Sequence, residues 1–160
     1  MSDKPFVHLH THSCYSLLDG AIRVPTLVDA AAEMGMPALA LTDHGNMFGI
    51  VEFLGAAAKA HVKPIVGSEV YVTVGPRGDR SQGQRNIRHI VLLAKNETGY
   101  RNLMQLSTIG YLEGYYYRPR VDHDDLERYS EGLIALSSCL KGEIPQLLLD
   151  GRYDEARVVA

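Results

Sequence analysis

The chain has no tryptophan, only two cysteines and no long apolar run. With Cys14 and Cys139 alone, a disulfide framework has no support, and each cysteine is better considered as a core residue or a metal ligand. No stretch approaches the roughly 20 apolar residues that a membrane-spanning helix needs, and residues 1–5 lack the apolar segment of a signal peptide. We therefore expect a cytoplasmic protein without a membrane partner.

An excess of positive charge is also lacking, since the net charge is −3. This balance argues against a generally basic nucleic-acid binder, although bound divalent cations would invert the field of a site built from carboxylates. A Gly-x-Ser-x-Gly elbow and a P-loop motif are both absent, which excludes the hydrolases and nucleotide-binding proteins that depend on them. The 160 residues, 46% of them hydrophobic, suffice for one domain with its own core, and we assign residues 1–160 to it.

Three histidines occupy every second position near the start of the chain, at His8, His10 and His12, and Asp19 follows. In an extended segment, side chains at i and i+2 point to the same side. Two imidazoles and a nearby carboxylate are a frequent set of ligands for zinc, manganese or iron. A solvated histidine run is the alternative, but an apolar segment and a specific turn flank this one. The pattern predicts a metal site, with His8 outside it.

Strand-like and helix-like patterns alternate along the chain. The expected strands cover residues 5–10, 38–42, 63–67, 89–94 and 133–137. The expected helices cover residues 26–34, 49–60, 97–112, 122–129, 143–149 and 153–160. Such alternation predicts an α/β fold with a mostly parallel sheet and a site at the carboxyl ends of its strands. Because the pattern stops inside the last helix without a cap, it also indicates a fragment of a longer protein.

Ligand-type side chains recur where the expected strands end: His10, His12, Asp19, His44, Glu69, His89 and Cys139. One zinc ion uses three or four protein ligands, so the set favours more than one metal, with Glu69 able to bridge two. Such a cluster would bind a phosphate oxygen and activate water for phosphoester hydrolysis without a separate general base. Two alternatives stay open: His89 as a hydrogen-bonded core histidine and Cys139 as a small buried apolar residue.

Arginines accompany glycines and tyrosines in two loops: Arg77, Arg80, Arg85, Arg88, Arg118 and Arg120. Beside the aromatic run Tyr115–Tyr117, they could contact a nucleic-acid backbone and stack bases. A solvated loop explains them equally well.

Five motifs resemble those of the PHP (polymerase and histidinol phosphatase) family. They are His10-Thr-His12 with Asp19-Gly20, Thr42-Asp-His44-Gly-Asn-Met47, Gly67-Ser-Glu69, His89-Ile-Val-Leu-Leu-Ala-Lys95 and Ser137-Ser-Cys139-Leu-Lys-Gly142. Longer phrases are similar to the branch of this family found at the N-terminus of the alpha subunit of bacterial DNA polymerase III. They are Tyr15-Ser-Leu-Leu-Asp-Gly20, Gly35-Met-Pro-Ala-Leu-Ala-Leu-Thr-Asp-His-Gly45 and Asn96-Glu-Thr-Gly-Tyr-Arg-Asn-Leu103.

The resemblance implies a distorted seven-stranded β/α barrel, truncated here in its C-terminal part, that holds up to three divalent metals. Zinc is the first choice and manganese or iron the others. It further implies a 3′–5′ exonuclease domain of a DNA-directed DNA polymerase, with a DNA 3′ end as substrate. Other polymerase III holoenzyme subunits, including a separate proofreading subunit, would be partners. All seven candidate residues match the family's ligands, whereas the Asp-x-His pair that closes the family's set does not follow Cys139.

Three other functions compete with this one. A metal-stabilised scaffold could dock a proofreading subunit without catalysing anything, and a free-standing PHP phosphatase could act on a small phosphate ester. An amidohydrolase barrel also begins with His-x-His, but it would need a bridging lysine where this chain offers Glu69.

Overall fold

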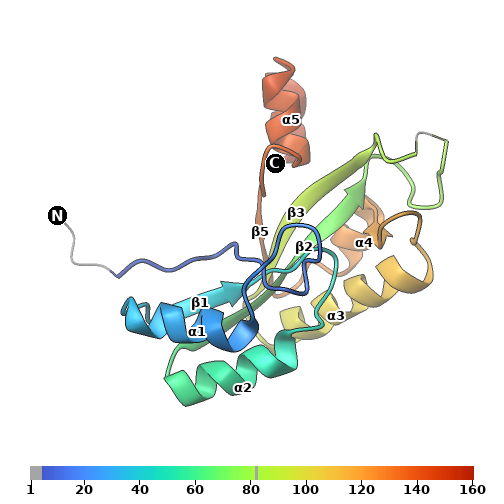
Figure 1. Cartoon of the computed structure of the whole chain (residues 1–160). Coiled ribbons are helices and arrows are strands. Elements are labelled where there is room, and N and C mark those ends of the chain that lie inside the picture. Colours follow the sequence, from blue (N-terminus) through green and yellow to red (C-terminus); the bar gives the residue numbers. More distant parts are fainter. Residues whose placement is uncertain (1–4, 82) are drawn as a thin grey trace.

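The fold is built around a five-stranded sheet (Figure 1). The computed structural model describes residues 5–81 and 83–160. The strands are β1 (Ala38–Leu41), β2 (Lys63–Thr73), β3 (Ile87–Ala94), β4 (Arg120–Val121) and β5 (Leu133–Leu136). Their order is β1, β2, β3, β5, with β4 paired to β2. β1 and β4 run parallel to β2, while β3 runs antiparallel to both β2 and β5.

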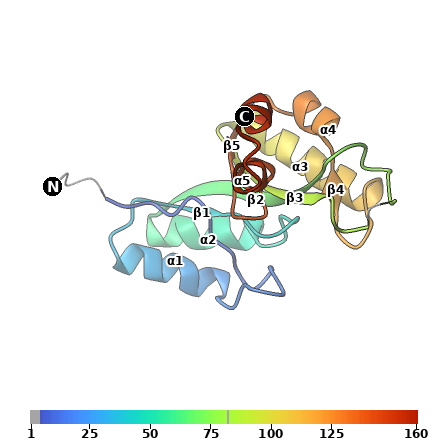
Figure 2. The same cartoon turned by 90° about the horizontal axis from the view of Figure 1, so that it is seen from above.

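Helices pack around this sheet. They are α1 (Val24–Glu33), α2 (Ile50–Ala60), α3 (Glu97–Leu112), α4 (His123–Arg128), α5 (Glu143–Leu149) and α6 (Tyr153–Val159). Figure 2 shows α1 and α2 near β1, and α3 and α4 near β3 and β4. Side chains fix where two of them begin: Asn96 accepts a hydrogen bond from the Gly99 amide at α3, and Asp122 and Asp125 form a capping box at α4. Within the described residues, no helix combines the length and apolar character needed to cross a membrane.

One face of the sheet carries most of the apolar core. Leu41 packs with α1 and α2, and Val70 and Val72 pack with α3. Val66, which pairs with Leu41, touches both clusters. Because side chains alternate along a strand, the odd-numbered Glu69 projects from β2 to the opposite face. The second face carries the polar Glu69 together with a smaller apolar cluster of Ala40, Val91 and Leu93.

Most predicted elements are confirmed, and the helix at residues 97–112 has the predicted bounds. The strand predicted at residues 5–10 is wrong, because residues 5–8 belong to no regular element and residues 9–10 form a bend. Two backbone hydrogen bonds of 2.9 Å hold the N-terminal segment beside β1. The Ala40 amide donates to the His8 carbonyl, and the Thr42 amide donates to the Thr11 carbonyl. β2 is longer than predicted, so Glu69 lies inside the strand and not beyond it.

The prediction of a mostly parallel, barrel-shaped sheet is also wrong for the described residues. A parallel pair needs a crossover connection, usually a helix, between its strands. In the described part of the connection, residues 74–81 and 83–86, no helix separates β2 from β3, and the chain returns antiparallel to β2. β1 and β5 do not pair with each other, so the sheet is open.

Candidate metal centre

Glu69 lies at the centre of a cluster of imidazoles, and its side chain is only 1% exposed. Its Oε2 atom lies 2.9 Å from Nε2 of His10, 3.0 Å from Nε2 of His12 and 3.2 Å from Nδ1 of His44. Its Oε1 atom lies 2.9 Å from Nδ1 of His89. One buried carboxylate thus contacts four histidines.

Separate elements bring these side chains together. His10 and His12 lie on the N-terminal segment beside β1, and His44 lies three residues after the end of β1. Glu69 belongs to β2, which pairs with β1 on one side and with β3 on the other. His44 forms a parallel bridge with Glu69, and His89 lies on β3. The central position of β2 therefore places its carboxylate between the histidines of both neighbours.

Asp19 extends the cluster towards solvent. Its Oδ2 atom lies 2.8 Å from Nε2 of His44, and its side chain is 54% exposed. Ligand-type atoms lie within 4.8 Å of one another in three overlapping sets, His10–His12–Glu69, His12–Asp19–His44 and His44–Glu69–His89. Ligand atoms around a tetrahedral zinc ion, each about 2.0–2.2 Å from it, lie roughly 3.3–3.6 Å apart. The spacing within these sets is close to that of a metal's coordination shell.

Cys139 lies at the margin of this cluster. Its Sγ atom is 3.8 Å from Oε1 of Glu69, and it belongs to none of the three sets. Because the residue is exposed, the alternative that it is a buried apolar side chain is wrong. Its neighbour Ser138 donates a hydrogen bond to the same oxygen, a contact that the sequence analysis missed. The Ser137-Ser-Cys139 motif was the available signal.

The PHP domain family matches residues 8–160 of the chain. The chain belongs to the PHP domain family. This PHP domain is 54% identical over 158 residues to DNA polymerase III subunit alpha of Treponema pallidum, which covers 98% of the chain. The corresponding proteins of Borreliella burgdorferi and Deinococcus radiodurans are each 50% identical, over 154 and 163 residues, covering 95% and 96% of the chain. The chain spans 12–14% of the length of these relatives.

The environment of the PHP domain's cluster favours an ionised Glu69. Burial by itself would raise the pKa of this carboxyl, but hydrogen bonds with His10, His12, His89 and Ser138 hold the pKa far below its usual range. The cluster therefore keeps a carboxylate, and not a carboxylic acid, at its centre.

Two of the histidines respond in opposite directions to this environment. Burial disfavours an imidazolium and sets the pKa of His44 below its ordinary value, despite the hydrogen bond to Asp19. At His12 burial acts in the same sense, but the hydrogen bond and charge of Glu69 outweigh it and raise the pKa. A neutral His44 retains the lone pair that a metal ligand needs.

Acid is expected to destabilise the metal-free PHP domain through Glu69. A carboxyl whose folded pKa is depressed contributes stability above its unfolded pKa, about 4.3, and loses it as the pH falls further. Urea denaturation in the presence of a chelator at pH 7, 5 and 3.5 measures this loss. A Glu69→Gln variant serves as the control and should show a smaller decline below pH 5. Parallel declines in both proteins would contradict the assignment.

Asp43 ties the histidine-bearing segment to the end of β1. It is 2% exposed, and its carboxylate accepts hydrogen bonds of 2.7 Å from the Ser13 amide, the Ser13 hydroxyl and the Ser16 hydroxyl. The same loop packs so closely that a Cβ at Gly20 would lie 1.8 Å from the Ser13 carbonyl oxygen. The sequence analysis did not identify Asp43 as a positioning residue, because it assigned the neighbouring His44 as the functional residue at this strand end.

Replacing Asp43 with alanine is expected to lower the free energy of unfolding by about 3 kcal/mol, because three buried donors lose a charged acceptor. Thermal and urea denaturation measure the change. Asp29→Ala, in which the carboxylate lies on the exposed side of α1, is the matched control and should leave the stability unaltered. Equal effects of the two substitutions would show that Asp43 does not hold the loop.

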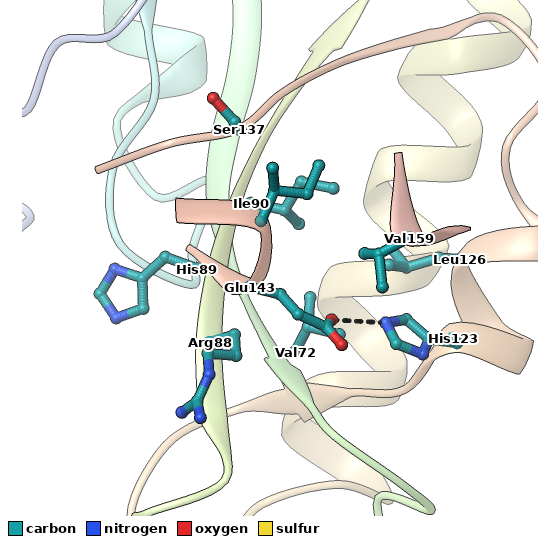
Figure 3. A pocket seen from close by; sticks show the side chains of 10 residues that line it. Val72, Arg88, His89, Ile90, His123, Leu126, Ser137, Glu143 and Val159 are labelled. Atoms are coloured by element: carbon teal, nitrogen blue, oxygen red, sulfur yellow. Dashed lines mark hydrogen bonds and ion pairs between the residues drawn. The ribbon is translucent and has the colours of Figure 1, made fainter. Parts of the chain in front are cut away.

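A cavity of about 470 Å³ opens above the cluster. All seven predicted ligands line it, together with Tyr71, Arg118 and Lys141 among others. A second cavity, of about 240 Å³, is shown in Figure 3. It holds an ion pair in which Nε2 of His123 lies 2.8 Å from Oε2 of Glu143, and the imidazole of His89 points away from that pair. Among the described residues, only the first cavity gathers sets of metal-ligand side chains.

Two of the six arginines considered for nucleic-acid contact have structural roles. Arg120 is 1% exposed, and its guanidinium donates to the carbonyls of Gly114, Asp79 and Arg77. Arg77 is half-buried and ion-paired with Asp125 at 2.9 Å. The prediction of nucleic-acid contact is therefore wrong for Arg120, since its donors are engaged inside the protein.

The other four arginines have different surroundings. Arg80 and Arg85 are exposed in the loop between β2 and β3, and the half-buried Arg88 donates to the carbonyls of Arg85 and Ile87. Arg118 stands apart, because it lines the cavity above the cluster.

Proposed function

We propose that this PHP domain is the N-terminal domain of a bacterial DNA polymerase III alpha subunit, and that its cluster is a multinuclear metal centre for phosphodiester hydrolysis. The substrate would be a DNA 3′ end and the activity a proofreading 3′–5′ exonuclease. The observation that carries the proposal is the Glu69-centred cluster, in which Glu69, His12 and His44 each belong to two of the three candidate ligand sets. The identity of about 50% with DNA polymerase III alpha subunits supports the polymerase context, and with it holoenzyme subunits as partners.

The residues present fit a divalent metal. Four imidazoles, two carboxylates and a nearby thiol suit zinc first and manganese or iron next. The Nδ1 atom of His12 is buried without a hydrogen-bond partner, although most buried polar atoms have one, and a metal would supply that partner. Glu69 would bridge metals held by His10 and His12 on one side and by His44 and His89 on the other.

Bound divalent metals would supply Lewis acidity at a phosphoryl oxygen and lower the pKa of water to about 7. The chain's own groups would bind and orient the substrate. Arg118 and Lys141 line the same cavity and would neutralise phosphate oxygens. Burial raises the pKa of the Tyr71 hydroxyl, so this group stays protonated at neutral pH and can donate a hydrogen bond.

The test combines elemental analysis with a nuclease assay. We expect about two to three equivalents of metal per chain and shortening of a 5′-labelled DNA strand from its 3′ end, both abolished by a chelator. His12→Ala should lose at least about one equivalent, because His12 belongs to two ligand sets. His8→Ala, which changes a nearby histidine outside these sets, should bind metal like the wild type. A wild-type chain without metal would overturn the proposal.

The scaffold alternative has support from one feature of the cluster. A bound metal would hold several segments of the chain to one another, because the side chains of the cluster come from different parts of it. Two strands, β2 and β3, contribute, as do the N-terminal segment, the loop that precedes α1 and the residues that follow β1 and β5. If chelation lowers the melting temperature while the DNA 3′ end is never shortened, the cluster is a scaffold and not an exonuclease.

A further inference from the structure

An aromatic groove lies beside the metal cluster. This cavity of about 220 Å³ is lined by tyrosines and one phenylalanine, namely Tyr15, Phe48, Tyr71, Tyr111, Tyr115 and Tyr117. Phe48 is 63% exposed, Tyr115 53% and Tyr117 59%. Large aromatic side chains gathered on a surface usually mark a binding site, whereas single exposed ones are ordinary.

The groove and the cavity above the cluster share a wall. Leu18, His44, Tyr71 and Arg118 line both. The guanidinium carbon of Arg118 lies 5.7 Å from the centre of the Tyr71 ring, at the boundary between the two. A ligand that extends from the cluster past Arg118 therefore enters the aromatic groove.

The chemistry of the groove differs from that of the cluster. Among the described residues, no aspartate or glutamate lines it, and its charged side chain is the Arg118 guanidinium. The rings of Tyr111 and Tyr115 stack with centres 6.1 Å apart, and Phe48 lies 5.9 Å from Tyr111. Aromatic faces next to a guanidinium match a nucleotide, whose base stacks on rings and whose phosphate pairs with the cation.

We propose that this groove is a nucleobase-binding subsite that stacks a base near the 3′ end of single-stranded DNA. Arg118 contacts the phosphate between the stacked base and the scissile bond. The inference rests on the proposed function, because it takes the cluster as the place where the phosphodiester is cleaved. It adds the requirement that the substrate be single-stranded near its end, since a base held inside a duplex cannot leave its neighbours to stack on a tyrosine ring.

The test measures binding of two 5′-fluorescein decathymidylates by fluorescence anisotropy in a chelator, so that neither metal nor hydrolysis contributes. One oligonucleotide is complete, and the other has abasic residues at its two 3′ positions. We expect the wild-type chain to bind the complete one about tenfold more tightly. Tyr115→Ala should remove this preference, and Tyr115→Phe should keep it because the ring remains. Tyr153→Ala, an exposed tyrosine of α6 outside the groove, is the matched control.

Equal wild-type affinity for both oligonucleotides would overturn the subsite and leave the groove as a protein-binding surface. The same holds if Tyr115→Ala weakens both by the same factor. Failure of the proposed function would give a different result. The chain would then bind no metal and shorten no DNA 3′ end, yet it would still bind the complete oligonucleotide more tightly than the abasic one. A circular dichroism melt of each variant confirms that the altered tyrosine has not unfolded the domain.

Discussion

Replacing Glu69 with glutamine is expected to remove most of the bound metal and to lower phosphodiester hydrolysis by about 100-fold or more. The two side chains have nearly the same shape, but glutamine presents an uncharged amide whose NH₂ group cannot bind a metal. Glu69 contributes to two of the three candidate ligand sets, so one substitution disables both. Elemental analysis and the 3′-end assay on the same preparation measure the two effects together.

Asp19→Asn is the matched comparison. Asp19 belongs to one ligand set only and is 54% exposed, so its substitution should cost about one metal and leave the others bound. If Glu69→Gln and Asp19→Asn lose the same amount of metal, Glu69 does not bridge. If Glu69→Gln loses none, the metals are held elsewhere, and the buried carboxylate serves only to hold the histidines by hydrogen bonds.

The convergence of the seven candidate residues could be predicted because periodicity and strand ends are local signals. The i, i+2 spacing predicted a common direction for His10 and His12, and both imidazoles contact Oε2 of Glu69 although their segment forms no strand. The residues after the apolar run of β1 emerge at its edge. The position of Glu69 in its strand differs from the predicted one. Glu69 projects from within β2 and not from beyond its end. His10 and His12 of the N-terminal segment contact it, although that segment does not pair as a strand.

The direction of β3 could not be predicted from the same signals. An apolar strand pattern is equally compatible with parallel and antiparallel neighbours, and only the connection decides. The loop that precedes β3 is long enough for a crossover, yet its described residues form no helix, and β3 returns antiparallel. Ser138 and Asp43 were missed for a related reason. Their hydrogen bonds join segments far apart in the sequence, and such contacts leave no local pattern.

Replacing Arg120 with methionine is expected to lower the free energy of unfolding by about 3–5 kcal/mol and the melting temperature by roughly 10 °C. Methionine retains much of the apolar length but none of the donors. Three carbonyls, those of Gly114, Asp79 and Arg77, would then lose their hydrogen bonds at a site where the side chain is 1% exposed. The guanidinium also lies 5.1 Å from the centre of the Tyr116 ring, so a cation–π contact is lost as well.

Two arginine variants separate this structural role from nucleic-acid contact. Arg152→Met removes an exposed arginine paired with Glu155 on the surface and should leave the melting temperature unchanged. Arg118→Met should weaken DNA binding without destabilising the domain, because its guanidinium lies in the wall of the cavity and not in the core. If Arg120→Met instead weakened DNA binding at unchanged stability, the buried hydrogen bonds would not be what retains this arginine. We therefore expect Arg120→Met to lower the melting temperature and Arg118→Met to lower the affinity for DNA.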